Sequence, residues 1–299
     1  MGDKKRVIIC WSNRSEYGLL LPVIRRLRKH FEVTEFRMDE GGDPFELGGL
    51  YESAYAFFHE CQPDLVITPF DRKAQIFAAL AARMLNLRVA QIHAGDISRE
   101  GTWDDLIRWQ ISLCCDYLFC NTEKSAERAR KLVELTGSSA KVFEVGSTAF
   151  DEIEVDTSLC PDGEFDLVVY HPPTRRPDLI EKELDEIESM IDKPTIWIGP
   201  SGDPSSDRIV ARAKKLEKEG KIRFYQNLPR AKFLGLLKGC TRAIGNSSSF
   251  FLELSCFGKK HIHIGMRNLG REVVRIRPGG SEKIAEILRK ELEETQTQG

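Results

Sequence analysis

Short apolar runs alternate with longer amphipathic segments along the chain. The runs are continuous rather than alternating, which is typical of parallel strands covered on both faces. In the first half, strands are predicted at 7–10, 33–36, 65–68, 89–93, 117–120 and 142–145, and helices at 18–30, 50–61, 74–85, 103–113 and 124–135. This alternation predicts βαβ units and a parallel sheet between helices.

A break separates this series from a second one. Residues 151–164 are acidic and show little periodicity, so we expect an interdomain linker. Strands follow at 167–170, 195–198, 222–225, 242–244 and 261–264, with helices at 179–191, 207–219, 230–238, 248–257 and 281–294. The pattern predicts an α/β protein with two Rossmann-like doubly wound domains, over residues 1–155 and 165–299. Ligands bind beyond the carboxyl ends of such strands, so the two domains are expected to face each other across a cleft.

Composition narrows the possible partners. The 44 basic and 46 acidic residues give a net charge of -2 without a basic tract, so nucleic acid is not an expected partner. No stretch approaches the ~20 apolar residues of a membrane span, and the N-terminal apolar run is too short for a signal peptide. The eight cysteines form no Cys-x-x-Cys pair. We therefore expect reduced thiols in a cytoplasmic protein.

The segment from Gly245 to Glu253 follows the strand at 242–244 and predicts a nucleotide site. Gly245 and Asn246 lead into a helix that opens with Ser247 and Ser248. Backbone N–H groups at the positive end of a helix dipole suit a phosphate. Glu253 would lie about one and a half turns into that helix, within reach of a sugar hydroxyl. From this segment alone, an ordinary serine N-cap with a solvated Glu is an equal alternative.

Acidic residues follow two strands of the first domain. Asp71 comes after the strand at 65–68, His93 and Asp96 after the strand at 89–93, and Asp104 and Arg108 on the next helix. Carboxylates whose pKa values are pushed apart can supply a general acid and a general base. For Asp71 taken alone, a helix cap is an equal alternative. Asp104 could instead favour the first turn of its helix electrostatically, but that alternative does not explain Asp96 and His93. We favour a functional cluster.

Further polar residues also lie at predicted strand ends. Arg14 could bind an anion after the first strand, and Asp203 lies in the loop after the strand at 195–198. Arg267 and Arg271, on a glycine-bracketed loop, could neutralise a diphosphate. His171 follows the strand at 167–170, and the histidines show no metal-ligand spacing, so neither a metal nor another cofactor is predicted.

Taken in order, these segments resemble the hydrolysing UDP-N-acetylglucosamine 2-epimerases, relatives of non-hydrolysing bacterial epimerases with the two-domain GT-B fold. The resemblance covers nearly the whole chain. It is carried by Arg14–Leu20, which looks like the family's Arg-Ala-Glu-Tyr-Gly-Leu-Leu loop, His93–Asp96 (His-Gly-Gly-Glu), Asp104–Arg108 (Asp-Glu-Ser-Ile-Arg), His171–Thr174 (His-Pro-x-Thr), Gly245–Ser249 with Glu253 (the UDP-binding block) and Gly265–Arg271 (Gly-x-Arg-Gln-x-Gly-Arg).

The resemblance implies a cofactor-independent enzyme that acts on a UDP-sugar, and a homodimer is a further expectation. Such an enzyme removes the C2 proton, expels UDP through a glycal-like intermediate and adds water to give N-acetylmannosamine or a related sugar. By this resemblance Asp71, Asp96 and Asp104 are the acid/base carboxylates, with Arg108 beside them. The expected UDP or substrate contacts are Arg14, His93, His171, Asp203, Asn246, Ser247, Ser248, Glu253, Arg267 and Arg271.

Three positions depart from the family pattern. Asp96 stands where the family has Glu, Trp109 where it has His, and Ser201 where it has Asn. Two alternatives are therefore kept: a GT-B glycosyltransferase with a UDP-sugar donor, and a UDP-sugar binder without catalysis. Release of UDP without an acceptor would separate the epimerase from both.

Overall fold

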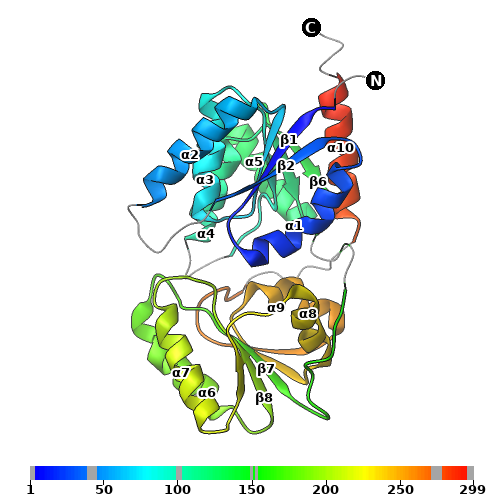
Figure 1. Ribbon diagram of the computed structural model, residues 1–299. Coiled ribbons are helices and arrows are strands. Elements are labelled where there is room, and N and C mark those ends of the chain that lie inside the picture. The colour runs from blue at the N-terminus through cyan, green and yellow to red at the C-terminus, as the bar shows by residue number, and fades with distance from the viewer. Residues whose placement is uncertain are drawn as a thin grey trace. The chain divides into compact units, whose positions relative to one another are not determined.

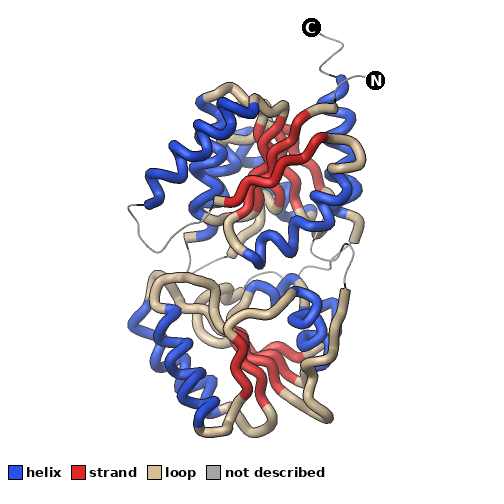
Figure 2. Tube along the Cα trace, viewed as in Figure 1, coloured by secondary structure: helices blue, strands red, loops and turns tan. Residues whose placement is uncertain are grey.

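The computed structural model describes residues 4–38, 46–98, 103–148, 151, 154–270 and 278–294. The chain divides into two compact units. The described residues of the first unit fall within Met1–Ile97, Asp104–Glu152 and Arg277–Gly299, and those of the second within Ser98–Trp103 and Ile153–Ile276. Each unit has its own parallel sheet with helices on both faces, so the predicted doubly wound α/β fold is confirmed (Figures 1 and 2).

The sheet of the first unit has the strand order β2-β1-β3-β4-β5-β6. Its strands are β1 (Arg6–Trp11), β2 (Glu32–Arg37), β3 (Leu65–Pro69), β4 (Val89–Ile92), β5 (Tyr117–Cys120) and β6 (Lys141–Glu144). One face packs against α2 (Glu46–Cys61), α3 (Lys73–Met84), α4 (Asp104–Leu113) and α5 (Glu123–Thr136). The other face packs against α1 (Arg14–Leu27) and α10 (Gly280–Glu294).

The last helix, α10, belongs to the first unit, so its predicted place in a second domain over 165–299 is wrong. It packs beside α1 (Figure 1), where Ile284, Leu288 and Leu292 are fully buried. The carboxylate of Asp151 accepts hydrogen bonds from the backbone N–H groups of Gly279 and Ser281 at the start of the helix. The apolar stripe of α10 completes a core that α1 alone leaves open, which periodicity along the sequence does not reveal.

The second unit has the strand order β11-β10-β7-β8-β9. Its strands are β7 (Asp166–Val169), β8 (Thr195–Ile198), β9 (Arg223–Tyr225), β10 (Arg242–Gly245) and β11 (Lys260–His263). One face packs against α6 (Ile180–Ser189), which follows the 3-10 turn η1 (Pro177–Leu179), and α7 (Ser206–Lys218). The other packs against α8 (Arg230–Gly239), α9 (Ser248–Leu252) and the 3-10 turn η2 (Leu254–Phe257).

The predicted helix at 248–257 is broken, and this is a second correction. The α-helical part, α9, ends at Leu252, and Glu253 is its C-cap with φ -119°. Phe250, Phe251 and Leu254 are all buried against the sheet, and η2 presents Leu254 after the break. Glu253 therefore follows the helix instead of lying within it. The other predicted elements are confirmed with bounds that differ by a few residues.

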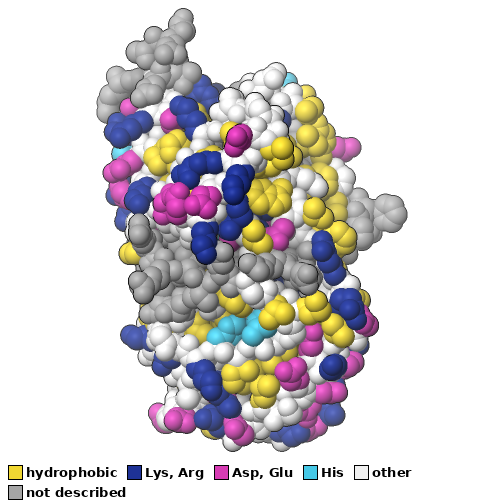
Figure 3. All heavy atoms as spheres, turned by 180° about the vertical axis from the view of Figure 1, so that it is seen from behind, with side chains coloured by type: hydrophobic (Ala, Val, Ile, Leu, Met, Phe, Trp, Pro, Cys, Tyr) yellow, Lys and Arg dark blue, Asp and Glu magenta, His cyan; other side chains and the backbone are white. Residues whose placement is uncertain are grey.

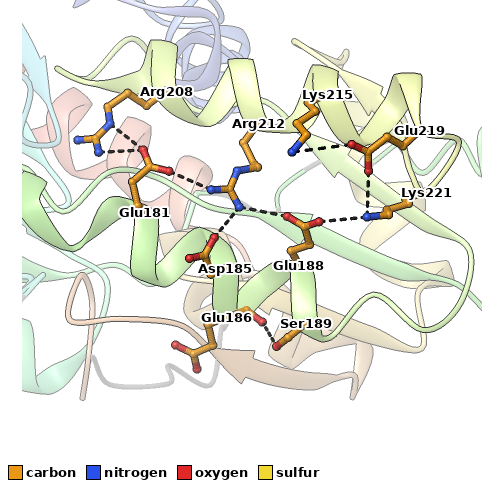
Figure 4. Close-up of polar contacts among 10 residues, drawn as sticks. All are labelled: Glu181, Asp185, Glu186, Glu188, Ser189, Arg208, Arg212, Lys215, Glu219 and Lys221. Atoms are coloured by element: carbon orange, nitrogen blue, oxygen red, sulfur yellow. Dashed lines mark hydrogen bonds and ion pairs between the residues drawn. The ribbon is translucent and has the colours of Figure 1, made fainter.

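The outer faces of α6 and α7 are joined by ion pairs (Figure 4). Arg212 lies 2.7 Å from Asp185, 3.0 Å from Glu181 and 3.1 Å from Glu188, measured between nitrogen and oxygen. Lys221 extends the network to Glu188 at 3.1 Å. Because these side chains are solvated, each pair contributes at most about 1 kcal/mol.

The surface shown in Figure 3 carries acidic and basic side chains interspersed on both units. Of the helices within the described residues, none combines the length and hydropathy that a bilayer crossing requires.

Candidate functional site

Polar residues that follow β3 and β4 meet at Arg108 of α4 in the first unit. Arg108 is buried and forms an ion pair with Asp71, which comes just after β3. Its Nη1 atom donates to the backbone carbonyl of Asp96 at 2.8 Å and to Oδ1 of Asp105 at 2.8 Å. Asp71, Asp96 and Arg108 were predicted as one cluster, and the structure brings them together. Asp105 joins them, although it was not among the predicted site residues.

The electrostatics of this cluster centre on Arg108. Burial acts to lower the pKa of its guanidinium, but Asp71, Asp96, Asp105 and Asp104 act in the opposite direction, and the pKa is raised. Asp104, the first residue of α4, thus lies close enough to contribute to the field at Arg108. Carboxylates that share a cation and also repel one another can include both an acid and a base at one site.

The loop after β4 begins with His93, whose φ of 65° lies in the left-handed region. The His93 ring is buried between Asn121 and Thr148. Nδ2 of Asn121 lies 2.7 Å from Nδ1 of His93, and Oγ1 of Thr148 lies 3.5 Å from Nε2. With the Asn121 amide donating to Nδ1, a neutral ring carries its proton on Nε2, toward Thr148. His93 therefore helps to shape the loop that leads to Asp96.

The same loop is pressed against the start of α5 at Gly95. A Cβ atom on Gly95 would lie 2.0 Å from the backbone oxygen of Ser125, and φ at Gly95 is 69°. Only glycine fits such a close approach without displacing the backbone. Nε of Arg128 donates to the carbonyl of Gly95 at 2.8 Å. These contacts hold Asp96, whose Oδ1 accepts from the N–H of Ile97 at 3.0 Å.

Glu16 is a buried carboxylate at the exit of β1 that was not predicted as a site residue. Its Oε2 accepts from the backbone N–H of Ser12 at 2.7 Å and from the Ser12 hydroxyl at 2.5 Å. The backbone N–H of Glu16 donates to Asn13, the N-cap of α1, at 3.0 Å. The spacing Asn-x-x-Glu is a capping-box pattern and could have drawn attention to it. The side chain of Arg14, on the same turn, lies outside what the structure describes.

In the second unit, Asn246 joins the exits of β10 and β7. Oδ1 of Asn246 accepts from the backbone N–H of His171 at 2.8 Å, and Nδ2 donates to the carbonyl of His171 at 2.9 Å. The backbone carbonyl of Asn246 accepts from Nδ2 of Asn268 at 2.8 Å. Asn246 therefore fixes the backbone around His171. Nδ1 of His171 accepts from the N–H of Ser201 at 3.2 Å, so a neutral ring carries its proton on Nε2.

The serines after Asn246 form the N-terminus of α9. Oγ of Ser247 accepts from the backbone N–H of Ser249 at 3.4 Å and lies 2.8 Å from Oγ of Ser249. Ser247 is buried and Ser248 is half-buried. The N-cap predicted as one alternative is thus present. It does not compete with a phosphate site, since a cap satisfies only some of the N–H groups at a helix start.

Arg267 and Asp203 form an ion pair beside His171. Nη1 of Arg267 lies 3.0 Å from Oδ2 of Asp203 and donates to the carbonyl of Pro172 at 2.9 Å. Both side chains are mostly buried. The structure therefore gathers Arg267, Asp203 and His171 at the carboxyl edge of the second sheet. Arg271 lies outside the described residues.

Glu253 has a cationic partner that the sequence did not reveal. Nη2 of Arg230, at the start of α8, lies 2.6 Å from Oε1 of Glu253, and the Glu253 side chain is buried. The predicted alternative of a solvated glutamate is therefore wrong. A cation in the first turn of a helix interacts unfavourably with the helix dipole. The position of Arg230 at the start of a predicted helix was therefore a sequence signal that it has an acidic partner.

Within the described residues, no group of three or more His, Cys, Asp or Glu side chains is placed to hold a metal ion.

Comparison with known proteins shows the family to which this chain belongs. The chain matches the family model described as UDP-N-acetylglucosamine 2-epimerase over residues 46–298. It is 26% identical to the UDP-N,N'-diacetylbacillosamine 2-epimerase (hydrolyzing) of Legionella pneumophila, over 90% of this chain and 83% of that protein. It is 30% identical to a polysialic acid biosynthesis protein of Escherichia coli, over 72% of this chain and 58% of that protein.

Among solved structures, the fold is similar to that of UDP-GlcNAc 2-epimerase from Neisseria meningitidis bound to UDP-GlcNAc. The TM-score is 0.75 and the sequence identity is 16%, and the match covers 98% of this chain and 100% of the other. The protein is thus an α/β protein of the GT-B class. It belongs to the UDP-N-acetylglucosamine 2-epimerase family, and the predicted family is confirmed.

Proposed function

We propose that the protein is a hydrolysing 2-epimerase that acts on a UDP-linked 2-acetamido sugar. The observation that carries this proposal is the cluster of Asp71, Asp96 and Asp104 around buried Arg108, in a chain of the epimerase family. The hydrolysing outcome is supported by the Legionella relative, whose name specifies it. The glycosyltransferase alternative gains no support from these relatives.

The proposed reaction needs a base, an acid and a water molecule. A carboxylate of the cluster removes the proton at C2 of the sugar, and the C1–O bond to UDP breaks, which leaves a glycal-like intermediate. Water then adds its hydroxyl group at C1 and gives its other proton to a carboxylate of the cluster, while a second, protonated carboxyl group delivers a proton to C2 on the opposite face. The products are UDP and a free 2-epimerised sugar. Arg108 keeps Asp71 and Asp105 in fixed positions through its ion pairs.

The second unit supplies the proposed nucleotide site. The N–H groups near Ser247 and Ser248 and the guanidinium of Arg267 would bind the diphosphate. Asp203 would orient Arg267 through the existing ion pair. Glu253, held by Arg230, would accept a hydrogen bond from a ribose hydroxyl. His171, oriented by Ser201 and Asn246, completes the proposed set.

The decisive experiment follows UDP release and the sugar product in D2O. UDP-GlcNAc and UDP-N,N'-diacetylbacillosamine are offered separately, without an acceptor, and products are identified by NMR. We expect equimolar UDP and a free 2-epimerised sugar that carries deuterium at C2, because the C2 proton exchanges during the reaction. Asp71→Asn should lower the rate about 100- to 10,000-fold, the usual range for loss of an acid or base.

Three outcomes would contradict the proposal in different ways. UDP release that depends on an added acceptor would identify a glycosyltransferase. Calorimetric binding of the UDP-sugar without turnover would identify a binding protein. An epimerised sugar still linked to UDP would identify a non-hydrolysing epimerase.

A further inference from the structure

One carboxylate of α6 differs from all its neighbours on that helix. Glu181, Asp185 and Glu188 point outward to the cations of α7 (Figure 4). Glu183 instead lies on the buried face with Ile180, Leu184 and Ile187 and is 5% exposed. A carboxylate on the apolar face of a helix is costly to bury, so its contacts need an explanation.

The partner of Glu183 is Tyr170, the residue directly before His171. The Tyr170 hydroxyl donates to Oε2 of Glu183 at 2.6 Å, and Tyr170 is fully buried. Burial raises the pKa of Tyr170, and the hydrogen bond to Glu183 raises it further, so the phenol stays protonated and donates. This bond ties α6 to the segment that leaves β7 toward His171.

The Glu183 carboxyl group also lies against Gly265, the first residue of the loop that carries Arg267. A Cβ atom on Gly265 would be 2.3 Å from Cδ of Glu183 and 2.3 Å from each of its oxygens. Gly265 has a φ of 72°, which favours glycine. The carboxyl group thus occupies the volume that any other side chain at position 265 would need.

These contacts place one buried side chain against both loops of the proposed nucleotide site. Arg267 itself links the two loops, since it donates to the carbonyl of Pro172 at 2.9 Å. We propose that Glu183, held by Tyr170, is a positioning residue that sets the loop of Arg267 against the β7 exit that carries His171. The inference rests on the proposed function, because the ligand of these loops is the diphosphate of the UDP-sugar.

The test compares three variants of the full chain in UDP binding, measured by calorimetry. Glu183→Ala should weaken UDP binding about tenfold, because the loop of Arg267 loses its support. Tyr170→Phe should have a similar effect, since it leaves the buried carboxyl group without its donor. Glu183→Gln should restore the affinity to within about threefold of the wild type, because the amide oxygen still accepts from Tyr170.

A matched control is Glu186→Gln, on the exposed side of α6 (Figure 4), which should bind UDP as the wild type does. With a UDP-sugar substrate, KM should rise in Glu183→Ala while kcat changes less than about threefold, since nucleotide binding weakens and the acidic cluster is untouched. Thermal unfolding of each variant shows which proteins are folded at the assay temperature. Tyr170→Phe removes a single oxygen and keeps the test available if Glu183→Ala does not fold.

The outcomes separate this inference from the function on which it rests. If the wild type does not bind UDP, the proposed function is overturned and the inference falls with it. If the wild type binds UDP and folded Tyr170→Phe and Glu183→Ala bind it equally well, only the inference is overturned. A uniform loss of thermal stability without a change in UDP affinity would likewise reduce Glu183 to a structural residue.

Discussion

Two arginines in this protein are each surrounded by three or more carboxylates. One joins the outer faces of two helices, and the other lies buried in the candidate catalytic cluster. Arg212 of α7 meets Glu181, Asp185 and Glu188, all on one neighbouring helix, and its side chain is 19% exposed. The side chain of Arg108 is 2% exposed, and it meets groups from the exits of two strands and from α4. The same chemistry therefore joins two helix surfaces in one unit and assembles a candidate catalytic cluster in the other.

The two arginines differ in the energetic cost of breaking their ion pairs. Water can replace the partners of Arg212, so its pairs are individually weak. The Arg108 guanidinium is buried, so water has little access to its ion pairs, and breaking them costs more than breaking solvated pairs. Convergence of chain segments and exclusion of water, rather than the number of ion pairs, distinguish the two regions.

The largest expected effect comes from Arg108→Met. It leaves Asp71 and Asp105, whose side chains are 22% and 26% exposed, without the buried cation that they share, so we expect a loss of about 2–3 kcal/mol in the free energy of unfolding. UDP release from the UDP-sugar should fall at least about 1000-fold. Urea denaturation and the coupled UDP assay measure the two effects. An Arg108→Met protein as stable as the wild type would show that burial does not make the ion pairs of Arg108 stronger than those of Arg212.

Gly95→Ala sharpens the comparison because it moves the cluster without changing its charges. The new Cβ would meet the backbone oxygen of Ser125, so the loop of Asp96 has to shift. We expect a loss of about 2 kcal/mol in stability and, since Asp96 is displaced, about 100-fold in rate. Gly48→Ala, at an exposed position of α2 where a Cβ would meet nothing within 4 Å, is the control and should be neutral or slightly stabilising.

Glu183 offers an intermediate case, a buried carboxylate beside solvated ones on the same helix. Burial raises its pKa above the ordinary value of 4.5, although the hydrogen bond from Tyr170 acts in the opposite direction. The folded protein therefore binds a proton there at a higher pH than the unfolded chain does. The resulting stabilisation is complete below pH 4.5 and is lost as the pH rises through the folded pKa.

Glu183→Gln removes this ionisation. We expect the stability of the variant relative to the wild type to increase as the pH rises from 4.5, the ordinary pKa of Glu183, toward neutrality. Urea denaturation of both proteins across that range is the measurement. A difference that stays constant with pH would show that Glu183 has the same pKa in the folded and unfolded states.

The smallest effect is expected for Arg212→Met. Its three partners are all partly exposed and share one cation, so their contributions do not add, and we expect a total loss of about 1 kcal/mol that shrinks in 1 M salt. UDP release should match that of the wild type. A loss comparable to that of Arg108→Met would mean that exposure does not distinguish the two arginines.

The sequence predicted the elements and the strand-end residues well because both depend on local patterns. Apolar runs mark strands, and polar residues directly after them mark the edge where ligands bind. Asp71, Asp96 and Arg108 were found in this way, and their proximity is observed, although their catalytic roles stay predictions. The homodimer and the cytoplasmic location also stay predictions.

Residues paired across long stretches of chain were missed. Arg230 begins α8 and Glu253 follows α9, and neither has a neighbour in the sequence that points to the other. Glu183 was one acidic residue among several on α6, yet it lies between Ile180, Leu184 and Ile187 on the buried face. That interruption of an apolar stripe was visible in the sequence. Its partner Tyr170 was not, because the contact depends on how α6 packs on the sheet.

The return of α10 to the first unit has a consequence for biosynthesis. Domains generally fold as they emerge from the ribosome, the N-terminal one first. Here Leu20, Val23 and Ile24 of α1 share one buried cluster with Ile284, Leu288 and Leu292 of α10, so this core is complete only when α10 has been translated. The second unit lies wholly before α10 in translation order. It is therefore expected to complete its fold first, while the first unit waits with an open core.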